Sequence, residues 1–116
     1  MSKLHTVWVA MEPQRWDAAS GAFVAQYDLT KALRYGDLKV ALAPRQSLLT
    51  LEPIVVALRE KFADFRDEDY LIAIGSPILI AISAHIALQR TGGYLNLLTW
   101  DRTEQQYLNT LIDIEP

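Results

Sequence analysis

The sequence predicts a single α/β domain built on a small, mainly parallel sheet. Between residues 38 and 100, apolar stretches of strand length alternate with apolar patterns of helix length, in the order strand, helix, strand, helix, strand. Right-handed crossovers join such strands, so this β-α-β-α-β core is expected to be parallel, with helices packed on the sheet. Two further stretches predict a C-terminal β-hairpin and an N-terminal strand added to the sheet. The chain has 116 residues, 51% of them hydrophobic, which is the size of one domain over residues 1–116.

The first half of the chain predicts short elements. Residues 5–11 are rich in β-branched and aromatic side chains, which favours a strand, and the polar stretch 12–21 favours a surface loop. Residues 23–27 predict a second, short strand. Residues 29–35 predict a single helical segment, which the preceding aspartate caps and the following glycine ends. Residues 38–43 predict the first strand of the parallel core.

The second half predicts longer elements. Residues 51–64 repeat apolar side chains at spacings of three and four, which predicts a helix with Thr50 as its N-cap. Residues 94–100 and 107–112 predict two strands joined by a turn. These two strands form the expected C-terminal hairpin.

Residues 70–89 form a run without formal charge that is long enough to cross a bilayer. Gly75, Ser76 and Pro77 interrupt this run in the way that a strand ends and a helix begins, with Ser76 as N-cap and the proline at the first helical position. We therefore expect no membrane span. We expect a buried strand over residues 70–74 and a helix over residues 77–90, with Ile78, Ile82 and Ile86 covered by the core.

Composition excludes several classes of function. The chain has no cysteine, which rules out disulfides, thiol catalysis and Cys-ligated metal centres. The net charge is −3, so the broad basic surface of a non-specific nucleic-acid binder is missing, which argues against nucleic acid as a partner. Charge is uneven: residues 1–50 carry six basic and four acidic side chains, whereas residues 51–116 carry five basic and ten acidic ones.

Four acidic residues cluster between the first predicted helix and the strand that follows it: Asp64, Asp67, Glu68 and Asp69. Carboxylate oxygens bind Mg²⁺ or Ca²⁺, but the glycine-bearing loop of an EF-hand is absent. The pattern favours a solvated helix-to-strand turn. We therefore expect no metal and no cofactor.

Three turns follow the carboxyl ends of predicted parallel strands, where ligands of open α/β sheets bind. They contribute six candidates for binding an anion such as a phosphate or a nucleotide: Arg45, Gln46, Gly75, Ser76, Asp101 and Arg102. Ser76 begins a helix whose free N–H groups attract anions, and the two arginines offer bidentate donors. The spacings of a P-loop and of a dinucleotide fingerprint are both missing. The pattern favours the alternative, a capped helix with two solvated arginines and an aspartate that opens a type I turn.

No catalytic residue is predicted. Ser83 and His85 lie two positions apart on one predicted helix, so they do not share a face and cannot form a nucleophile–base pair. We expect His85 to be partly buried with a hydrogen bond. We expect Ser83 to donate to a carbonyl of the preceding turn.

The aromatic residues are candidate interface anchors, since Trp and Tyr dominate binding hot spots. Trp8 and Trp100 lie within predicted strands and are expected in the core. Trp16 lies beside Arg15 in the polar loop, where no periodicity assigns it to a core. Arg15 and Trp16 are therefore candidates for binding a partner, with a side chain folded back on the sheet as the equal alternative.

Short motifs in the second half resemble a group of small proteins encoded by tailed bacteriophages, over about residues 28–110. They are Leu58-Arg59-Glu60-Lys61-Phe62, Asp64-Phe65, Asp67, Asp69-Tyr70-Leu71, Gly75-Ser76-Pro77, Gly92-Gly93 and Leu97-Leu98-Thr99-Trp100-Asp101-Arg102. In that group an aspartate usually stands between the glycine and the proline, where this chain has Ser76. The resemblance implies a viral protein that acts in the host bacterial cytoplasm, and it carries no activity over.

The sequence therefore favours a non-enzymatic phage accessory protein that binds a host or phage protein. The alternative is a small-molecule or nucleotide binder, or an enzyme, that uses the carboxyl edge of the sheet. A homodimer is also expected, because a small domain with edge strands has apolar surface left to cover.

Overall fold

The computed structural model describes residues 5–114, and within that range the chain alternates strands with helices. The elements are β1 (Thr6–Met11), β2 (Gln14–Asp17), β3 (Ala22–Ala25), the 3-10 helix η1 (Thr30–Arg34), β4 (Asp37–Leu42), α1 (Glu52–Lys61), the 3-10 helix η2 (Phe62–Asp64), β5 (Tyr70–Ile72), α2 (Pro77–Thr91), β6 (Tyr94–Asp101) and β7 (Gln106–Asp113). None of the helices in residues 5–114 combines the length and the apolar character that crossing a membrane requires.

Five strands form one sheet in the order β4-β1-β5-β6-β7, and all neighbours are parallel except β6 and β7. The mixed α/β class, the mostly parallel sheet and the C-terminal hairpin are as predicted. The N-terminal strand, however, lies inside the sheet, between β4 and β5, so these two strands are not neighbours. At this interior position β1 has a strand neighbour on each edge, and its four consecutive buried residues, 7–10, pack on both faces of the sheet.

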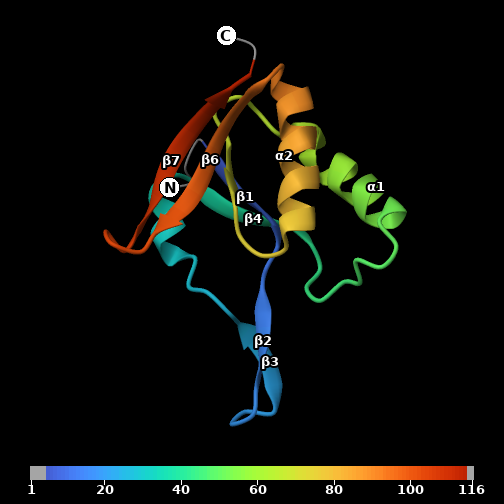
Figure 1. Ribbon diagram of the computed structural model, residues 1–116, viewed down its shortest axis with the longest axis vertical. Coiled ribbons are helices and arrows are strands. Elements are labelled where there is room, and N and C mark those ends of the chain that lie inside the picture. The colour runs from blue at the N-terminus through green and yellow to red at the C-terminus, as the bar shows by residue number, and fades with distance from the viewer. Residues whose placement is uncertain (1–4, 115–116) are drawn as a thin grey trace.

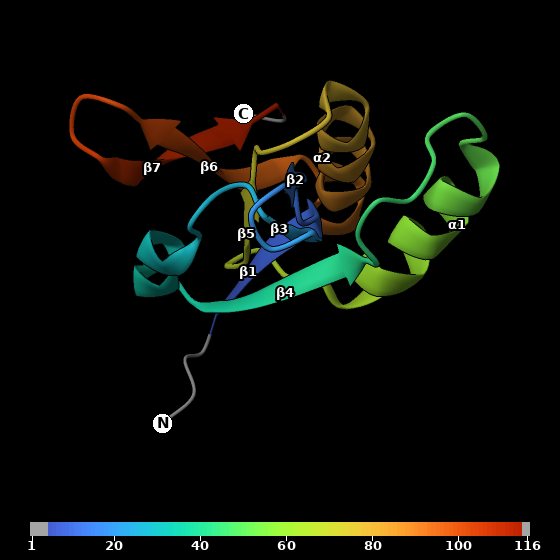
Figure 2. The same ribbon diagram turned by 90° about the horizontal axis from the view of Figure 1, so that it is seen from below.

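The two faces of the sheet are covered differently. Helices α1 and α2 pack on one face, and η1 packs on the other (Figure 2). The helix-covered core contains the buried residues Trp8, Ala10, Ala41, Leu42, Ile54, Leu58, Phe62, Phe65, Leu71, Leu79, Ile86, Ala87 and Leu95. The core under η1 is smaller and contains Val7, Val9, Leu29, Ala32, Ile72, Leu98 and Tyr107. On this face, therefore, the helical cover is the five-residue 3-10 helix η1.

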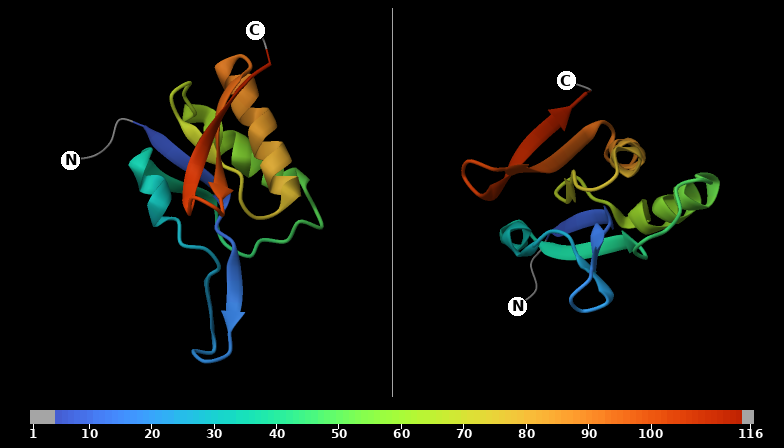
Figure 3. Two further views of the ribbon diagram at one scale, coloured as in Figure 1. Left: turned by 60° about the vertical axis from the view of Figure 1, so that its left-hand side comes forward. Right: turned by 60° about the horizontal axis from the view of Figure 1, so that its bottom comes forward.

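Strands β2 and β3 form an antiparallel hairpin that extends away from the body of the protein (Figures 1 and 3). Its two ends meet where the N–H of Gln26 donates to the carbonyl of Pro13 at 2.9 Å. The prediction of a loop over residues 12–21 is wrong in part, since Gln14–Asp17 are a strand. Three of its four side chains are polar or charged, so the sequence pattern resembles that of a surface loop.

Helix α2 begins as predicted, because the Ser76 hydroxyl accepts from the N–H of Ile78 at 3.2 Å and Pro77 follows at the first position. It ends at Gly92, whose φ of 77° is left-handed. Its buried face was predicted wrongly: Ile86 is buried, but Ile82 is only half-buried and Ile78 is 46% exposed. A helix that is apolar all round does not reveal which of its faces meets the sheet.

Two helix starts also differ from the prediction. Leu51 occupies the N-cap of α1 without a side-chain hydrogen bond, so Thr50 is not the cap. The expected helix over residues 29–35 is the 3-10 helix η1. Leu29 is its N-cap, without a side-chain hydrogen bond, so Asp28 is not the cap; the Asp28 carboxylate instead accepts from the N–H of Thr30, the first helical residue, at 2.9 Å.

Candidate functional site

The carboxyl ends of the parallel strands frame two adjoining hollows that share Gln26, Tyr27 and Gly75. The smaller, which we call the hairpin-base hollow, has a volume of about 400 Å³ and is lined by Met11, Glu12, Pro13, Gln14, Gln26, Tyr27, Arg45, Gly75, Ser76 and Leu79. The larger, which we call the β6 hollow, measures about 770 Å³. It is lined by Gln26, Tyr27, Asp28, Lys31, Ala73, Ile74, Gly75, Thr99, Trp100, Arg102, Gln105 and Tyr107. The predicted edge is therefore concave, but it is divided.

The six anion candidates are distributed over this edge rather than gathered at one point. Gly75 lines both hollows, Arg45 and Ser76 line the hairpin-base hollow, and Arg102 lines the β6 hollow. Gln46 is exposed and lines neither hollow. The two arginines thus face different cavities.

Backbone conformation explains two of these positions. Gly75 has a φ of 87°, which a residue with a side chain rarely adopts, and this conformation turns the chain from β5 into α2. Arg45 also has a positive φ, of 60°, and its guanidinium lies 4.1 Å from the centre of the Phe23 ring. Arg45 is therefore held against the hairpin.

Asp101 opens the turn between β6 and β7. Its carboxylate accepts from the N–H groups of Thr103 at 2.9 Å and Glu104 at 3.3 Å. In the same turn, the side-chain amide of Gln105 donates to the carbonyl of Arg102 at 2.6 Å. Both carboxylate contacts are local, which is the turn-forming role that the sequence favoured.

The β6 hollow also contains groups that the sequence did not point to. Trp100 is 40% exposed, so its expected place in the core is wrong, and its ring meets Tyr107 edge-on at 5.0 Å. The Lys31 ammonium lies 5.8 Å from the centre of the Trp100 ring and donates to the carbonyl of Gln105 at 2.8 Å. Lys31 belongs to η1 and lies more than seventy positions before Gln105 in the sequence, so local sequence patterns could not predict this contact.

Two ionisable groups of the β6 hollow have shifted pKa values. The N–H of Thr30 donates to the Asp28 carboxylate and lowers the pKa of Asp28. Burial raises the pKa of the Tyr107 phenol, and the negative charge of Asp28 raises it further. The β6 hollow therefore combines the Asp28 carboxylate and the Tyr107 phenol with the basic side chains of Lys31 and Arg102.

The hairpin presents an exposed aromatic pair. Trp16 on β2 stands opposite Phe23 on β3, with their ring centres 5.3 Å apart in an edge-to-face arrangement. Trp16 is 57% exposed and Phe23 44% exposed, although Phe23 also carries the Arg45 guanidinium. Arg15 is exposed on the opposite face of the hairpin, because neighbouring residues of a strand alternate.

The acidic cluster is not a wholly solvated turn. Asp69 is only 3% exposed, and its carboxylate accepts from the N–H groups of Thr6 and Arg66 at 3.0 Å and from the Trp8 indole at 3.4 Å. Asp64, Asp67 and Glu68 are exposed. Among residues 5–114, no three or more His, Cys, Asp or Glu side chains are grouped to hold a metal ion.

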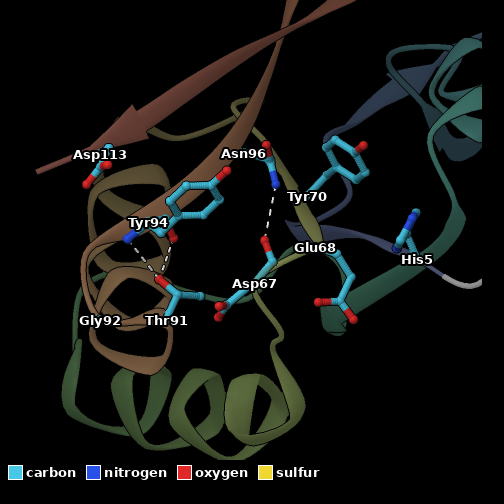
Figure 4. A pocket seen from close by; sticks show the side chains of 9 residues that line it. All are labelled: His5, Asp67, Glu68, Tyr70, Thr91, Gly92, Tyr94, Asn96 and Asp113. Carbon is cyan, nitrogen blue, oxygen red and sulfur yellow. Dashed lines mark hydrogen bonds between the residues drawn. The ribbon is translucent and has the colours of Figure 1, made fainter. Parts of the chain in front are cut away.

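A further hollow of about 580 Å³ lies at the amino edge of the sheet (Figure 4), lined by His5, Asp67, Glu68, Tyr70, Thr91, Gly92, Tyr94, Asn96 and Asp113. Some of its polar groups bond to one another, whereas the buried Nδ1 of His5 has no hydrogen-bond partner among residues 5–114. The amide of Asn96 donates to the carbonyl of Asp67 at 3.2 Å, and the hydroxyl of Thr91 accepts from the N–H of Tyr94 at 3.0 Å. The first contact joins β6 to the loop before β5, and the second closes the turn between α2 and β6.

Ser83 and His85 differ from their predictions. Ser83 is fully buried, and its hydroxyl has no hydrogen-bond partner among residues 5–114. His85 is exposed. The two side chains lie on different faces of α2, so the sequence was right to exclude them as a nucleophile–base pair.

Comparison with known proteins identifies a family but no individual relative. Neither the curated proteins nor the solved structures include a match to this chain. The sequence pattern of the family described as Phage Pam3 gp32-like protein matches residues 5–114. This match covers nearly the whole chain and confirms the resemblance to phage proteins. The chain therefore belongs to the Phage Pam3 gp32-like protein family.

Proposed function

We propose that this phage protein acts by binding another protein, of the host or of the phage, through the β2–β3 hairpin. In this proposal the protein works in the cytoplasm of the infected cell and without catalysis. The observation that carries it is the Trp16–Phe23 pair, which is exposed on a hairpin that extends away from the body.

The pair has the properties of a binding anchor. Large aromatic side chains dominate hot spots because they bury a large apolar area on binding and have few side-chain torsion angles to immobilise. Each ring already restrains the other, and Arg45 stacks on Phe23, so little freedom is left to lose on binding. Arg45 adds positive charge beside the pair, whereas Arg15 and Asp17 balance each other on the opposite face of the hairpin. The partner that fits is a protein with an apolar groove and an acidic rim.

The test is capture of the partner from infected cells with the wild-type protein, followed by affinity measurement with the purified partner. Replacing both Trp16→Ala and Phe23→Ala should weaken binding by at least about 100-fold, because hot-spot aromatics contribute about 2 kcal/mol or more each. Leu49→Ala is the matched control, since Leu49 is 97% exposed in a loop of the body. Unchanged affinity in the double variant, or an equal loss in Leu49→Ala, would refute the proposal.

A second candidate function rests on the β6 hollow. It is concave, lies at the end of the sheet where α/β proteins bind ligands, and combines the Trp100 ring with Lys31 and Arg102. These groups suit a ligand with a flat ring and an anionic group, such as a nucleotide. In this alternative the protein is a small-molecule binder.

Titration of nucleotides and inorganic phosphate, followed by chemical shifts, tests this candidate. Arg102→Ala should lower the affinity about tenfold to a hundredfold, since a hydrogen bond to a charged group contributes about 1.5 to 3 kcal/mol. Arg59→Ala removes an exposed arginine on α1 and should leave the affinity unchanged. No saturable shift with any of these ligands would reject the candidate and leave protein binding as the function.

A further inference from the structure

Strand β7 is an outer strand of the sheet, and β6 is its only strand neighbour. Outer strands expose backbone N–H and C=O groups that pair readily with another chain. The opposite outer strand, β4, carries the charged residues Asp37 and Lys39, which discourage such pairing. Strand β7 has eight residues, and its single charged residue, Asp113, stands at its C-terminal end.

Three hydrogen bonds show which backbone groups of β7 face outward. In an antiparallel ladder, every second residue directs its backbone N–H and C=O groups to the partner strand. The N–H of Ile114 donates to the carbonyl of Gly93 at 2.9 Å, so the even-numbered residues of β7 direct these groups to β6. The carbonyl of Leu98 accepts from the N–H of Ala73, directly after β5 on the other side of β6, so the backbone groups of Asn109, which stands opposite Leu98, point away from β6. The carbonyl of Tyr107 accepts from the Tyr35 hydroxyl at 2.7 Å, as an outward group would.

Asn109 and Leu111 therefore direct their backbone N–H and C=O groups away from the sheet. Apolar side chains lie beside them: Leu108 is 42% exposed, Leu111 52% and Ile114 57%. The segment thus offers hydrogen bonds and apolar area together. These are the two requirements for adding a strand.

We propose that β7 pairs antiparallel with β7 of a second copy, around a two-fold axis at Thr110. In an antiparallel pair, residues directly opposite each other have their side chains on the same face of the sheet. Between two identical strands, a two-fold axis meets this condition only when it passes through a residue, and not when it passes between two residues. Centring on Thr110 sets Asn109 opposite Leu111 and forms four backbone hydrogen bonds from these two residues of each copy. In this register Tyr107, whose carbonyl already accepts from Tyr35, lies at the end of the pairing, opposite Asp113, whereas centring on Asn109 would set Tyr107 opposite Leu111, next to the axis.

The Thr110 register is self-complementary, which is why the occupant is a second copy. Leu108 meets Ile112 of the other chain, and Thr110 meets Thr110, a favourable cross-strand pair. Residues 106–112 are uncharged, so no like charges meet. The two sheets become one continuous sheet. This inference is independent of the proposed function.

The test measures the oligomeric state by sedimentation at high micromolar concentration. Wild-type protein should be a dimer. Thr110→Lys should be monomeric, because it sets two lysines opposite each other, and Thr103→Lys, which adds the same charge in the exposed turn, should stay dimeric. Circular dichroism confirms that each variant is folded.

Mixing Thr110→Lys with Thr110→Glu tests the register itself. Opposite charges then face each other, so the mixture should form a mixed dimer although each variant alone is monomeric. A monomeric wild type, a dimeric Thr110→Lys, or a mixture that remains monomeric would each overturn the proposal.

Discussion

Asp69 joins two parts of the chain that are more than sixty residues apart. Its carboxylate receives backbone N–H groups from Thr6, where β1 begins, and from Arg66, before β5, together with the Trp8 indole. These contacts fix the starts of two neighbouring strands relative to each other. A buried carboxylate that accepts several hydrogen bonds stabilises the fold and is not available to bind water or a metal ion.

Asp69→Asn should therefore destabilise the protein. The amide keeps the shape of the side chain but only one acceptor oxygen, so its NH₂ must face either the N–H of Thr6 or the N–H groups of Arg66 and Trp8. At least one donor then loses its acceptor, so a loss of about 1 to 3 kcal/mol is expected. Chemical denaturation measures it.

Asp67→Asn is the control for that measurement. Asp67 is exposed and two residues away, so its change should stay within about 0.5 kcal/mol. Equal effects of the two substitutions would contradict the structural role of Asp69. The sequence could not distinguish these four acids, because the donors that bury Asp69 lie far along the chain.

At the scale of elements, the sequence predicted the ends of α2 better than its orientation. Ser76, Pro77 and Gly92 act through local geometry, so their neighbours in sequence suffice to predict the start and the end of the helix. Which face is buried depends on how the helix lies on the sheet. The buried residues Leu79, Ser83, Ile86 and Ala87 mark that face.

Two isoleucines of α2 test this orientation with identical chemistry. Ile86→Ala removes a side chain that is 2% exposed and should cost about 2 to 5 kcal/mol. Ile78→Ala removes one that is 46% exposed and should cost less than about 1 kcal/mol. Denaturation midpoints compare the two variants, and similar losses would show that the helix is turned differently.

At the scale of the molecule, the alternation of strands and helices was sufficient for the fold class and the parallel sheet. The place of β1 was not predictable from local patterns, because it depends on the route of the crossover from β1 to β4. That crossover holds a hairpin and η1 instead of a full helix. The same route brings Tyr27, Asp28 and Lys31 to the carboxyl edge, which is why the sequence found Arg102 and Gly75 there but missed these three.

The closed base of the hairpin makes it an exchangeable unit. The chain leaves and re-enters the body at Pro13 and Gln26, which are joined by one backbone hydrogen bond, and no side chain of residues 14–25 belongs to either core. Substitutions there leave the packing of the sheet and helices untouched. Substitution or replacement of this segment is therefore expected to carry little risk to the folding of the rest of the domain.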